Sequence, residues 1–348
     1  THSSVLPPPP PPYATLEERG GNLRRGSPIK PSVFPPSHPQ KKAHDVSGVV
    51  VLGMHRSGTS LLTGLFARMG LAVGERNELI WGANPDDNKK GFWERTDMVI
   101  GNDLLLKHQR AHWASDADRF NGDVAYDAWA SNRGRDGIFE APWGSWKSSG
   151  DAALRWLGQH QPFVLKDPRL CLTVGFWRRV IEETGGGLPA VVITWRHPVE
   201  VAQSLAKRDE GFQRLTRGLR LWLTYTQSSI AHTSGLCRVV TSNRMVNAQP
   251  LAELTRLRSE LAEQCGLVTP LDVTQRDVDE FVDSKLQRNH ATERGQNGCP
   301  PPDHSTLSWA DPSNARQRQA YDQAMRVFCD LESGVALTDS YIWPIPLQ

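Results

Sequence analysis

A strong excess of either charge is the first thing that this sequence lacks. Its 348 residues include 40 lysines and arginines and 38 aspartates and glutamates, so the formal net charge is only +2. A chain so balanced has no overall field that would attract nucleic acid, and any basic site must therefore be local. The chain also lacks an apolar run of about 18 residues, the length that a membrane-spanning helix needs. We therefore expect no nucleic-acid partner and no membrane span in these residues.

Cysteine is also scarce. The chain has five cysteines, an odd number without a C-x-x-C pair: Cys171, Cys237, Cys265, Cys299 and Cys329. Their scattered positions indicate neither a zinc site nor a disulfide scaffold. The acceptor sequence for N-glycosylation, N-x-S/T, is absent too, which weakens the case for a glycosylated luminal protein.

Proline is unevenly distributed, and its distribution divides the chain. Residues 1–46 hold eleven of the 25 prolines and few apolar residues. Such a segment cannot bury a core, so we expect a disordered, proline-rich tail over 1–46. Strand and helix patterns alternate over residues 47–290, which predicts an α/β domain. Residues 291–348 contain a proline-rich connection and a helical pattern, and we expect a C-terminal loop and helix packed on that domain.

Short runs of β-branched and other apolar residues mark the buried strands of the α/β domain. We expect strands at 49–52, 163–165, 190–195 and 238–241. We expect helices from residue 57, over 96–108, from Asp167-Pro168 as cap and first residue, and over 198–208, 212–230, 251–265, 274–290 and 314–332. The alternation predicts a three-layer fold with a parallel sheet between two layers of helices. Ligands of such sheets bind at the carboxyl ends of the strands.

The first expected strand and helix meet in residues 49–62, VVVLGMHRSGTSLL. This stretch can be compared with the nucleotide-binding pattern G-x-x-x-x-G-K-[ST], in which loop amides hold phosphates and the lysine reaches the outer ones. Three residues of the loop match that pattern: Gly53, Gly58 and Ser60. Thr59 replaces the lysine, and the nearest cation is Arg56. The sequence therefore predicts a P-loop-like anion site without the lysine of an ATPase.

A cation follows each of three expected strands at its carboxyl end: Arg56, Lys166 and Arg196. The carboxyl ends of parallel strands lie along one edge of the sheet, so these side chains should line one pocket. Nearby hydroxyl groups would come from the loop residues Ser57, Thr59 and Ser60. The sequence therefore predicts a pocket for an anionic ligand at this edge.

Three segments together resemble the PAPS-dependent sulfotransferases, where PAPS is 3′-phosphoadenosine 5′-phosphosulfate. VVVLGMHRSGTSLL is similar to their 5′-phosphosulfate-binding loop. VVITWRHPVEVAQSL is similar to their 3′-phosphate-binding segment, which ends a strand in an arginine and has a serine eight residues later, here Arg196 and Ser204. FVLKDPRL, with Lys166, resembles a Lys-Asp-Pro motif of the tyrosylprotein sulfotransferases and their bacterial relatives. The chain differs from the cytosolic sulfotransferases, which have a lysine where Arg56 stands.

The resemblance implies an α/β, P-loop-containing sulfotransferase that uses PAPS as co-substrate and needs no metal. It would move the sulfuryl group to a hydroxyl or amine by in-line displacement and release adenosine 3′,5′-bisphosphate. The implied donor-binding residues are Arg56, Ser57, Gly58, Thr59, Ser60, Leu61, Arg196 and Ser204. The acceptor stays open between a small molecule, a carbohydrate and a protein tyrosine, and a homodimer is compatible with the resemblance. The location stays open as well: the cytoplasm or a plastid, or the Golgi lumen if an anchor precedes Thr1.

The implied chemistry needs positive charge at the leaving group and a base for the acceptor. Lys166 and Arg56 are the expected source of charge, because sulfuryl transfer, like phosphoryl transfer, depends on positioning and charge stabilisation. Glu94, in NKKGFWERTD, is the preferred base, since the related enzymes have a glutamate after the first helix. His55, next to the loop, could also transfer a proton. Further carboxylates remain as alternatives: Asp97, Glu75 and Glu78.

Two other functions are compatible with parts of the sequence. A P-loop kinase or NTPase would use Gly53, Gly58 and Ser60, and would bind ATP in a Mg²⁺-dependent manner. Thr59 in the lysine position and the RHP…S segment speak against it. An inactive homologue that only binds anions or glycans is the other alternative, and in it a Glu94→Ala substitution would have no effect.

Overall fold

The computed structural model describes residues 46–80, 91–131, 152–183, 187–212, 214–282, 299 and 315–345. The expected proline-rich tail, apart from residue 46, lies outside these ranges, as does most of the connection before the last helix. The described strands are β1 (Gly48–Leu52), β2 (Phe163–Lys166), β3 (Ala190–Trp195) and β4 (Arg238–Ser242). The helices include α1 (Thr59–Arg68), α2 (Thr96–His108), α3 (Gly122–Ser131), α5 (Leu170–Glu183), α6 (Pro198–Arg208), α7 (Leu215–Ala231), α8 (Asn243–Ala248), α9 (Pro250–Cys265), α10 (Gln275–Phe281) and α11 (Ala315–Glu332).

The four strands form one parallel sheet in the order β2-β1-β3-β4. Parallel neighbours cannot be joined by a tight turn, so each connection crosses over outside the sheet through at least one helix. The strands are short and mostly apolar because both faces of such a sheet are covered. The predicted α/β fold with a parallel sheet is therefore confirmed.

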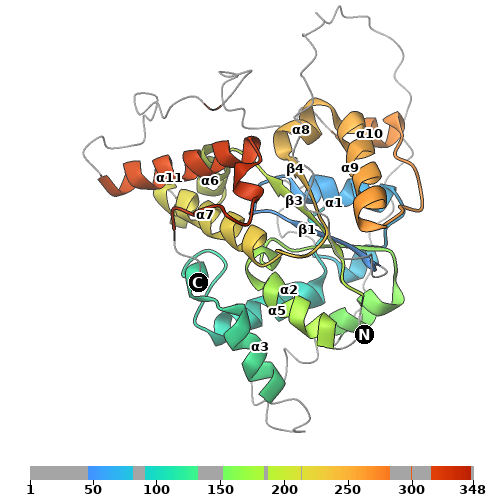
Figure 1. Ribbon diagram of the computed structural model, residues 1–348, viewed down its shortest axis with the longest axis horizontal. Helices are drawn as coiled ribbons and strands as arrows, with labels where there is room; N and C mark the ends of the chain where they lie inside the picture. The colour runs from blue at the N-terminus through green and yellow to red at the C-terminus, as the bar shows by residue number, and fades with distance from the viewer. Residues whose placement is uncertain are drawn as a thin grey trace, which may run out of the picture. The chain divides into compact units, whose positions relative to one another are not determined.

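Alternation along β1 divides the protein interior into two cores. Val49 and Val51 belong to a cluster with buried residues of α1, α9 and α10. Val50 and Leu52 point to the other face and join a larger cluster with residues of α2, α5, α6, α7 and α11. In Figure 1 the helices α1, α8, α9 and α10 accordingly lie to one side of the strands, and the remaining helices to the other. The sheet is thus the middle of three layers, as expected.

Several element boundaries follow the sequence patterns, whereas one helix start does not. The bounds of α2, β3 and α6 are those expected. The expected cap and first residue of α5, Asp167 and Pro168, are wrong, because that helix begins at Leu170. A tight turn precedes it, in which the Leu170 amide donates to Asp167 O and the Asp167 carboxylate accepts from the Arg169 amide. Asp167 therefore shapes the end of β2 rather than the helix.

The expectation that the cysteines form no disulfides is wrong for four of them. Cys237, just before β4, pairs with Cys265 at the end of α9, and Cys299 pairs with Cys329 in α11. The partners are 28 and 30 residues apart, and only the packing of helix on strand or loop brings them together. Cys171 is free and buried, and burial raises the pKa of its thiol to about 12. That thiol is therefore neutral at physiological pH.

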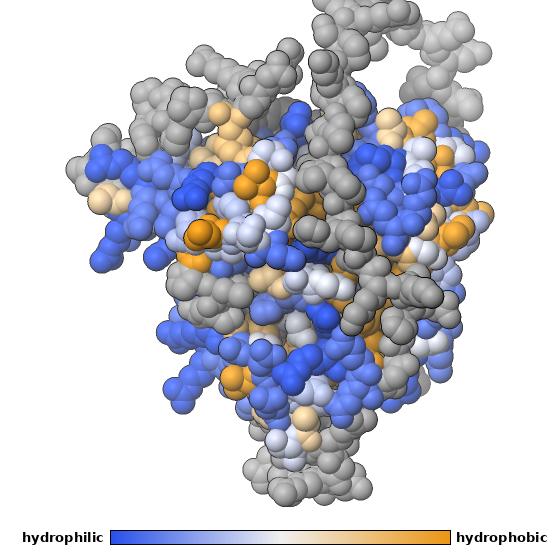
Figure 2. Space-filling view, in the orientation of Figure 1, coloured by the Kyte–Doolittle hydropathy of each residue, from blue (hydrophilic) through white to orange (hydrophobic). Residues whose placement is uncertain are grey.

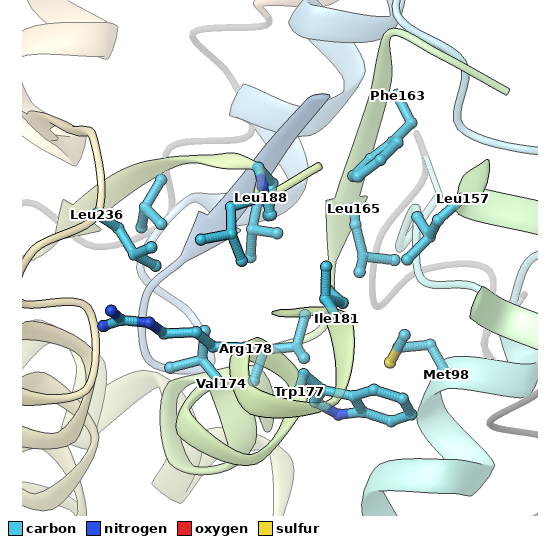
Figure 3. Close-up of a pocket in the computed structure, with 14 residues that line it drawn as sticks. Met98, Leu157, Phe163, Leu165, Val174, Trp177, Arg178, Ile181, Leu188 and Leu236 are labelled. Atoms are coloured by element: carbon cyan, nitrogen blue, oxygen red, sulfur yellow. The ribbon is translucent and has the colours of Figure 1, made fainter. Parts of the chain in front are cut away.

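A small apolar cavity of about 30 Å³ lies between the sheet and α5. Figure 3 shows Phe163 and Leu165 of β2 facing Val174 and Trp177 of α5 across it. Several lining residues, such as Leu188, lie at the amino-terminal ends of the strands, opposite the edge where ligands of parallel sheets bind. The space suits at most about one water molecule and offers it no polar group, so it is a packing defect and not a ligand site.

The described surface in Figure 2 is mostly hydrophilic, with apolar side chains in small separate groups. The large apolar side chains that are exposed belong to different parts of the chain: Ile100, Val124, Val268, Leu271, Val335 and Ile342. Isolated apolar residues of this kind are normal on a protein surface. None of the helices in the described ranges is long and apolar enough to cross a bilayer.

Candidate functional site

The anion loop begins after β1 and ends at the first turn of α1. Gly53 passes so close to β3 that an added Cβ would lie 2.6 Å from Thr194 O. Gly58 precedes α1 with φ 86°, a left-handed conformation that favours glycine. Arg56 has φ 71°, a conformation that costs a residue with a side chain about 1–3 kcal/mol and is common at functional sites. The loop thus turns sharply and presents the free amides of α1 at the carboxyl edge of the sheet.

The hydroxyl side chains of the loop differ in their surroundings. Ser57 is 0% exposed, and its Oγ has no hydrogen-bond partner among the described residues. A buried hydroxyl without a partner is rare, and each one needs an explanation. Thr59 is 3% exposed, with its methyl group beside Gly53, so the position of the kinase lysine holds an inward-facing side chain. Leu61, in the first turn of α1, is half-buried at the edge of the core.

The two segments expected to bind phosphates are in direct contact. Arg56 Nε donates to Ser204 Oγ on α6 at 2.8 Å. Arg196, which follows β3, donates from Nη1 to the backbone oxygen of Arg56 at 3.3 Å. These residues come from positions 140 or more apart in the sequence and meet because β1 and β3 are neighbours in the sheet. The structure therefore brings the first loop and the Arg196 segment together.

Arg196 is held by further groups that the sequence reasoning missed. Its Nε donates to the Glu200 carboxylate at 2.6 Å, and Trp222 Nε1 donates to its backbone oxygen at 3.1 Å. Glu200 and Ser204 lie four residues apart on one face of α6, and Arg196 lies four residues before Glu200, just ahead of that helix. The spacing could have identified Glu200 as a partner, although an acidic residue is unexpected beside a phosphate site.

Lys166, the last residue of β2, meets the loop from its other side. Its Nζ donates to Glu94 Oε1 at 2.5 Å, to Phe92 O at 3.1 Å and to Ser60 Oγ at 3.2 Å. The two charged partners are buried, with Lys166 3% and Glu94 8% exposed. The structure therefore brings the expected cation and the preferred base together with a loop hydroxyl.

Burial raises the pKa of the Glu94 carboxyl, and this effect outweighs the opposing attraction of Lys166. The position of Lys166 is fixed in turn by the next residue. Asp167 is fully buried, and it accepts from Asn102 Nδ2 at 2.8 Å and from Arg169 Nη1 at 3.0 Å. A base with a raised pKa beside a fixed cation is an arrangement typical of acid–base sites.

The other carboxylates considered as bases surround Arg95 instead. Asp97 pairs with Arg95 Nη2 at 2.7 Å, and Glu78 with Arg95 Nη1 at 3.2 Å. Glu75 forms a reciprocal cap with Glu78 at the start of a single 3₁₀ turn. These contacts fix the loop after α1 and leave Asp97, Glu75 and Glu78 with structural partners.

His55 is packed into the core side of the loop. Its ring lies 4.7 Å from the ring of Trp113 and 5.8 Å from that of Tyr225, between centroids. Its Nε2 is buried without a hydrogen-bond partner among the described residues. Burial lowers the pKa of His55 well below its usual value, and nearby cations, Arg169 first, lower it further. His55 is therefore neutral at physiological pH, with its unpartnered nitrogen covered by protein.

Among the described ranges, no group of three or more His, Cys, Asp or Glu side chains is arranged to hold a metal ion. Ser60, which would carry the Mg²⁺-binding hydroxyl of an NTPase, instead accepts a hydrogen bond from Lys166. Around the loop the structure brings together cations, hydroxyl groups and a carboxylate with a raised pKa, which are groups that can bind an anion and accept a proton.

No family model and no curated protein matches the chain. Two solved structures are similar to it, and both are sulfotransferase domains. The domain from the curacin biosynthetic pathway is 12% identical with a TM-score of 0.39, over 80% of this chain and 97% of that one. The domain from the Synechococcus PCC 7002 olefin synthase is 14% identical with a TM-score of 0.34, over 89% and 94%. Similarities this low carry no weight for function, and the resemblance to the tyrosylprotein branch stays a prediction.

Proposed function

We propose that this chain is a sulfotransferase that moves the sulfuryl group of PAPS to a hydroxyl or amine and releases adenosine 3′,5′-bisphosphate. The observation that carries the proposal is the contact between its two anion segments: Arg56 Nε to Ser204 Oγ at 2.8 Å. One segment is a loop at a helix N-terminus, and the other is a strand end with Arg196. Two such sites held side by side fit a donor that carries one phosphate at its 5′ and another at its 3′ position.

In this proposal the loop amides and Arg56 hold the 5′-phosphosulfate, and Arg196 with Ser204 holds the 3′-phosphate. The buried Ser57 hydroxyl, which has no partner among the described residues, would receive one from the donor. Arg196 enters this role with its Nε already fixed by Glu200 at 2.6 Å, so its direction is set before the donor arrives.

The transfer itself is a displacement at sulfur. The acceptor oxygen forms a bond to sulfur while the bond between sulfur and the bridging oxygen breaks, and the electron pair of that bond leaves with the 5′-phosphate. Lys166 stabilises the negative charge that develops there. The acceptor proton passes to Glu94, whose raised pKa makes it a stronger base than an ordinary carboxylate. The Lys166 to Glu94 contact of 2.5 Å keeps the two groups that take part in these events beside each other.

The alternatives fit the geometry less well. A kinase needs a lysine that reaches the outer phosphates and a hydroxyl for Mg²⁺, but Thr59 is 3% exposed and Ser60 is bonded to Lys166. An inactive anion-binding homologue would gain nothing from a buried lysine–glutamate pair, which is costly to bury. Both remain outcomes of the tests described below.

The proposal is tested by calorimetric titration of the purified chain with adenosine 3′,5′-bisphosphate. Arg196→Ala and Ser204→Ala should each weaken binding, by about tenfold or more for the arginine, because a hydrogen bond to a charged group contributes about 1.5–3 kcal/mol. Arg178→Ala is the matched control, since Arg178 on α5 lies beside Leu188 at the opposite edge of the sheet. Binding that is equally strong in Arg196→Ala and in Arg178→Ala would contradict the proposed donor site.

A further inference from the structure

The C-terminal helix α11 lies against the end of β3, outside the segments that carry the resemblance. It packs on α6 and α7, beside which it is drawn in red in Figure 1. Its last residue, Glu332, accepts from Trp195 Nε1 at 2.7 Å and from Arg244 Nη2 at 2.9 Å. One turn earlier, Phe328 packs edge-on against the ring of His197, with centroids 4.9 Å apart. The same face of α11 thus contacts the residues on both sides of Arg196.

These contacts fix the backbone from which Arg196 projects. Trp195 is 2% exposed, and its indole N–H would be left unpaired in the core without an acceptor such as Glu332. His197 occupies the position just before α6, where Pro198 is the first residue. The position of Trp195 and the start of α6 therefore determine where the guanidinium of Arg196 lies.

We infer that Glu332 is a positioning residue for Arg196, so that α11 forms part of the donor site. The inference rests on the proposed function, because it assigns the 3′-phosphate of the donor to Arg196. Without the Glu332 carboxylate, Arg196 keeps its charge and its bond to Glu200, but the backbone from which it projects is held less firmly. Binding of a 3′-phosphate depends on where the Arg196 guanidinium points, whereas binding of a 5′-phosphate at the loop before α1 does not.

The consequence can be measured as a change in selectivity. Adenosine 3′,5′-bisphosphate and adenosine 5′-monophosphate differ only in the 3′-phosphate, so the ratio of their dissociation constants reports on Arg196. We expect Glu332→Ala to weaken binding of the bisphosphate about tenfold and to change binding of the monophosphate less than about twofold. Glu332→Gln should retain most of the selectivity, because its amide oxygen can still accept from the Trp195 indole.

A matched control lies two residues away on the same helix. Asp330→Asn makes the same change in charge as Glu332→Gln, but the Asp330 carboxylate accepts from Tyr341 Oη at 2.6 Å and not from Trp195. It should leave both dissociation constants unchanged. If Glu332→Ala does not fold, Trp195→Phe removes the indole donor from the other side of the contact, and it should cause the same selective loss.

Each outcome separates this inference from the proposed function. If the unmodified chain binds the two nucleotides equally well, the proposed donor site is wrong. If it prefers the bisphosphate and Glu332→Ala keeps that preference, Glu332 has no positioning role and only this inference fails. An equal loss for both nucleotides would also overturn it, because that result indicates a general loss of the folded site.

Discussion

Replacing Lys166 by methionine removes the charge that accompanies the buried carboxylate of Glu94. Their contact is 2.5 Å, and the side chains are 2% and 10% exposed. An ion left alone in such surroundings destabilises a protein by about 3–5 kcal/mol. For a domain of this size each kcal/mol lowers the melting temperature by about 2–4 °C. We therefore expect Lys166→Met to melt about 6–20 °C below the unmodified chain at pH 8.

The loss should depend on pH, and its sign follows from the pKa of Glu94. Burial already raises the pKa of Glu94 above the usual 4.5. Because the charge of Lys166 lowers this pKa, removing the lysine will raise it further. The folded state then binds more protons than the unfolded state between 4.5 and the raised pKa, so stability is lost as pH rises through this window. The deficit of Lys166→Met should therefore be complete at pH 8 and shrink as pH falls toward 5.

Melting curves followed by circular dichroism provide the assay, and a second substitution provides the decisive comparison. Lys166→Met with Glu94→Gln leaves no unpaired charge at these two positions and should recover most of the lost stability. Arg276→Met breaks an exposed pair with Glu280, which contributes little to stability, and serves as the control for a lost cation. A deficit that persists in the double variant, or that is the same at pH 5 and pH 8, would refute the reasoning.

Three other substitutions test the packing of the fold. Cys299→Ser opens a disulfide with a separation of 30 residues, which should destabilise the folded state by up to about 3.5 kcal/mol. The variant should therefore melt several degrees below the unmodified chain in non-reducing buffer and at the same temperature with reductant. An equal difference in melting temperature in both buffers would contradict this. Burial lowers the pKa of His197, against the influence of Glu200 and Glu332, so the folded state binds fewer protons below about pH 6.5 and its stability falls as pH drops. In a series of melting curves from pH 8 to 5, His197→Gln should reduce the loss of stability at low pH. An unchanged dependence of the melting temperature on pH would contradict this role of His197. Val191→Ile adds a methylene group beside the 30 Å³ cavity and should stabilise the fold by up to about 0.7 kcal/mol in urea unfolding, whereas a loss would mean that the group does not fit there.

The elements that the sequence predicts well are those whose signals are local. The apolar run of β3 and the proline that starts α6 have the bounds expected, because burial and a fixed φ act on neighbouring residues. The start of α5 was wrong because the Asp167 side chain bonds to Arg169 and Asn102 instead of capping the helix. Local propensity could not decide between these partners, since one of them is 65 residues away.

In the site, too, the sequence predicts positions better than contacts. The positions of Arg56, Lys166 and Arg196 at strand ends follow from the order of strands and loops in the sequence. Their partners do not, because Glu94 lies 72 residues from Lys166 and Glu332 lies 137 residues from Trp195. The disulfides escaped prediction for the same reason, since Cys237 and Cys265 meet only once α9 packs on β4. Contacts between segments distant in the sequence depend on how the helices and strands pack, and the spacing of residues along the chain does not predict that packing.

The most direct test of the central claim is a calorimetric titration of the unmodified chain with adenosine 3′,5′-bisphosphate, with and without Mg²⁺, beside ATP. We expect the bisphosphate to bind equally well in EDTA and in Mg²⁺, and more tightly than ATP, because two fixed anion sites and no metal hold it. Tighter binding of ATP that requires Mg²⁺, with no binding of the bisphosphate, would contradict the account and indicate a phosphotransferase.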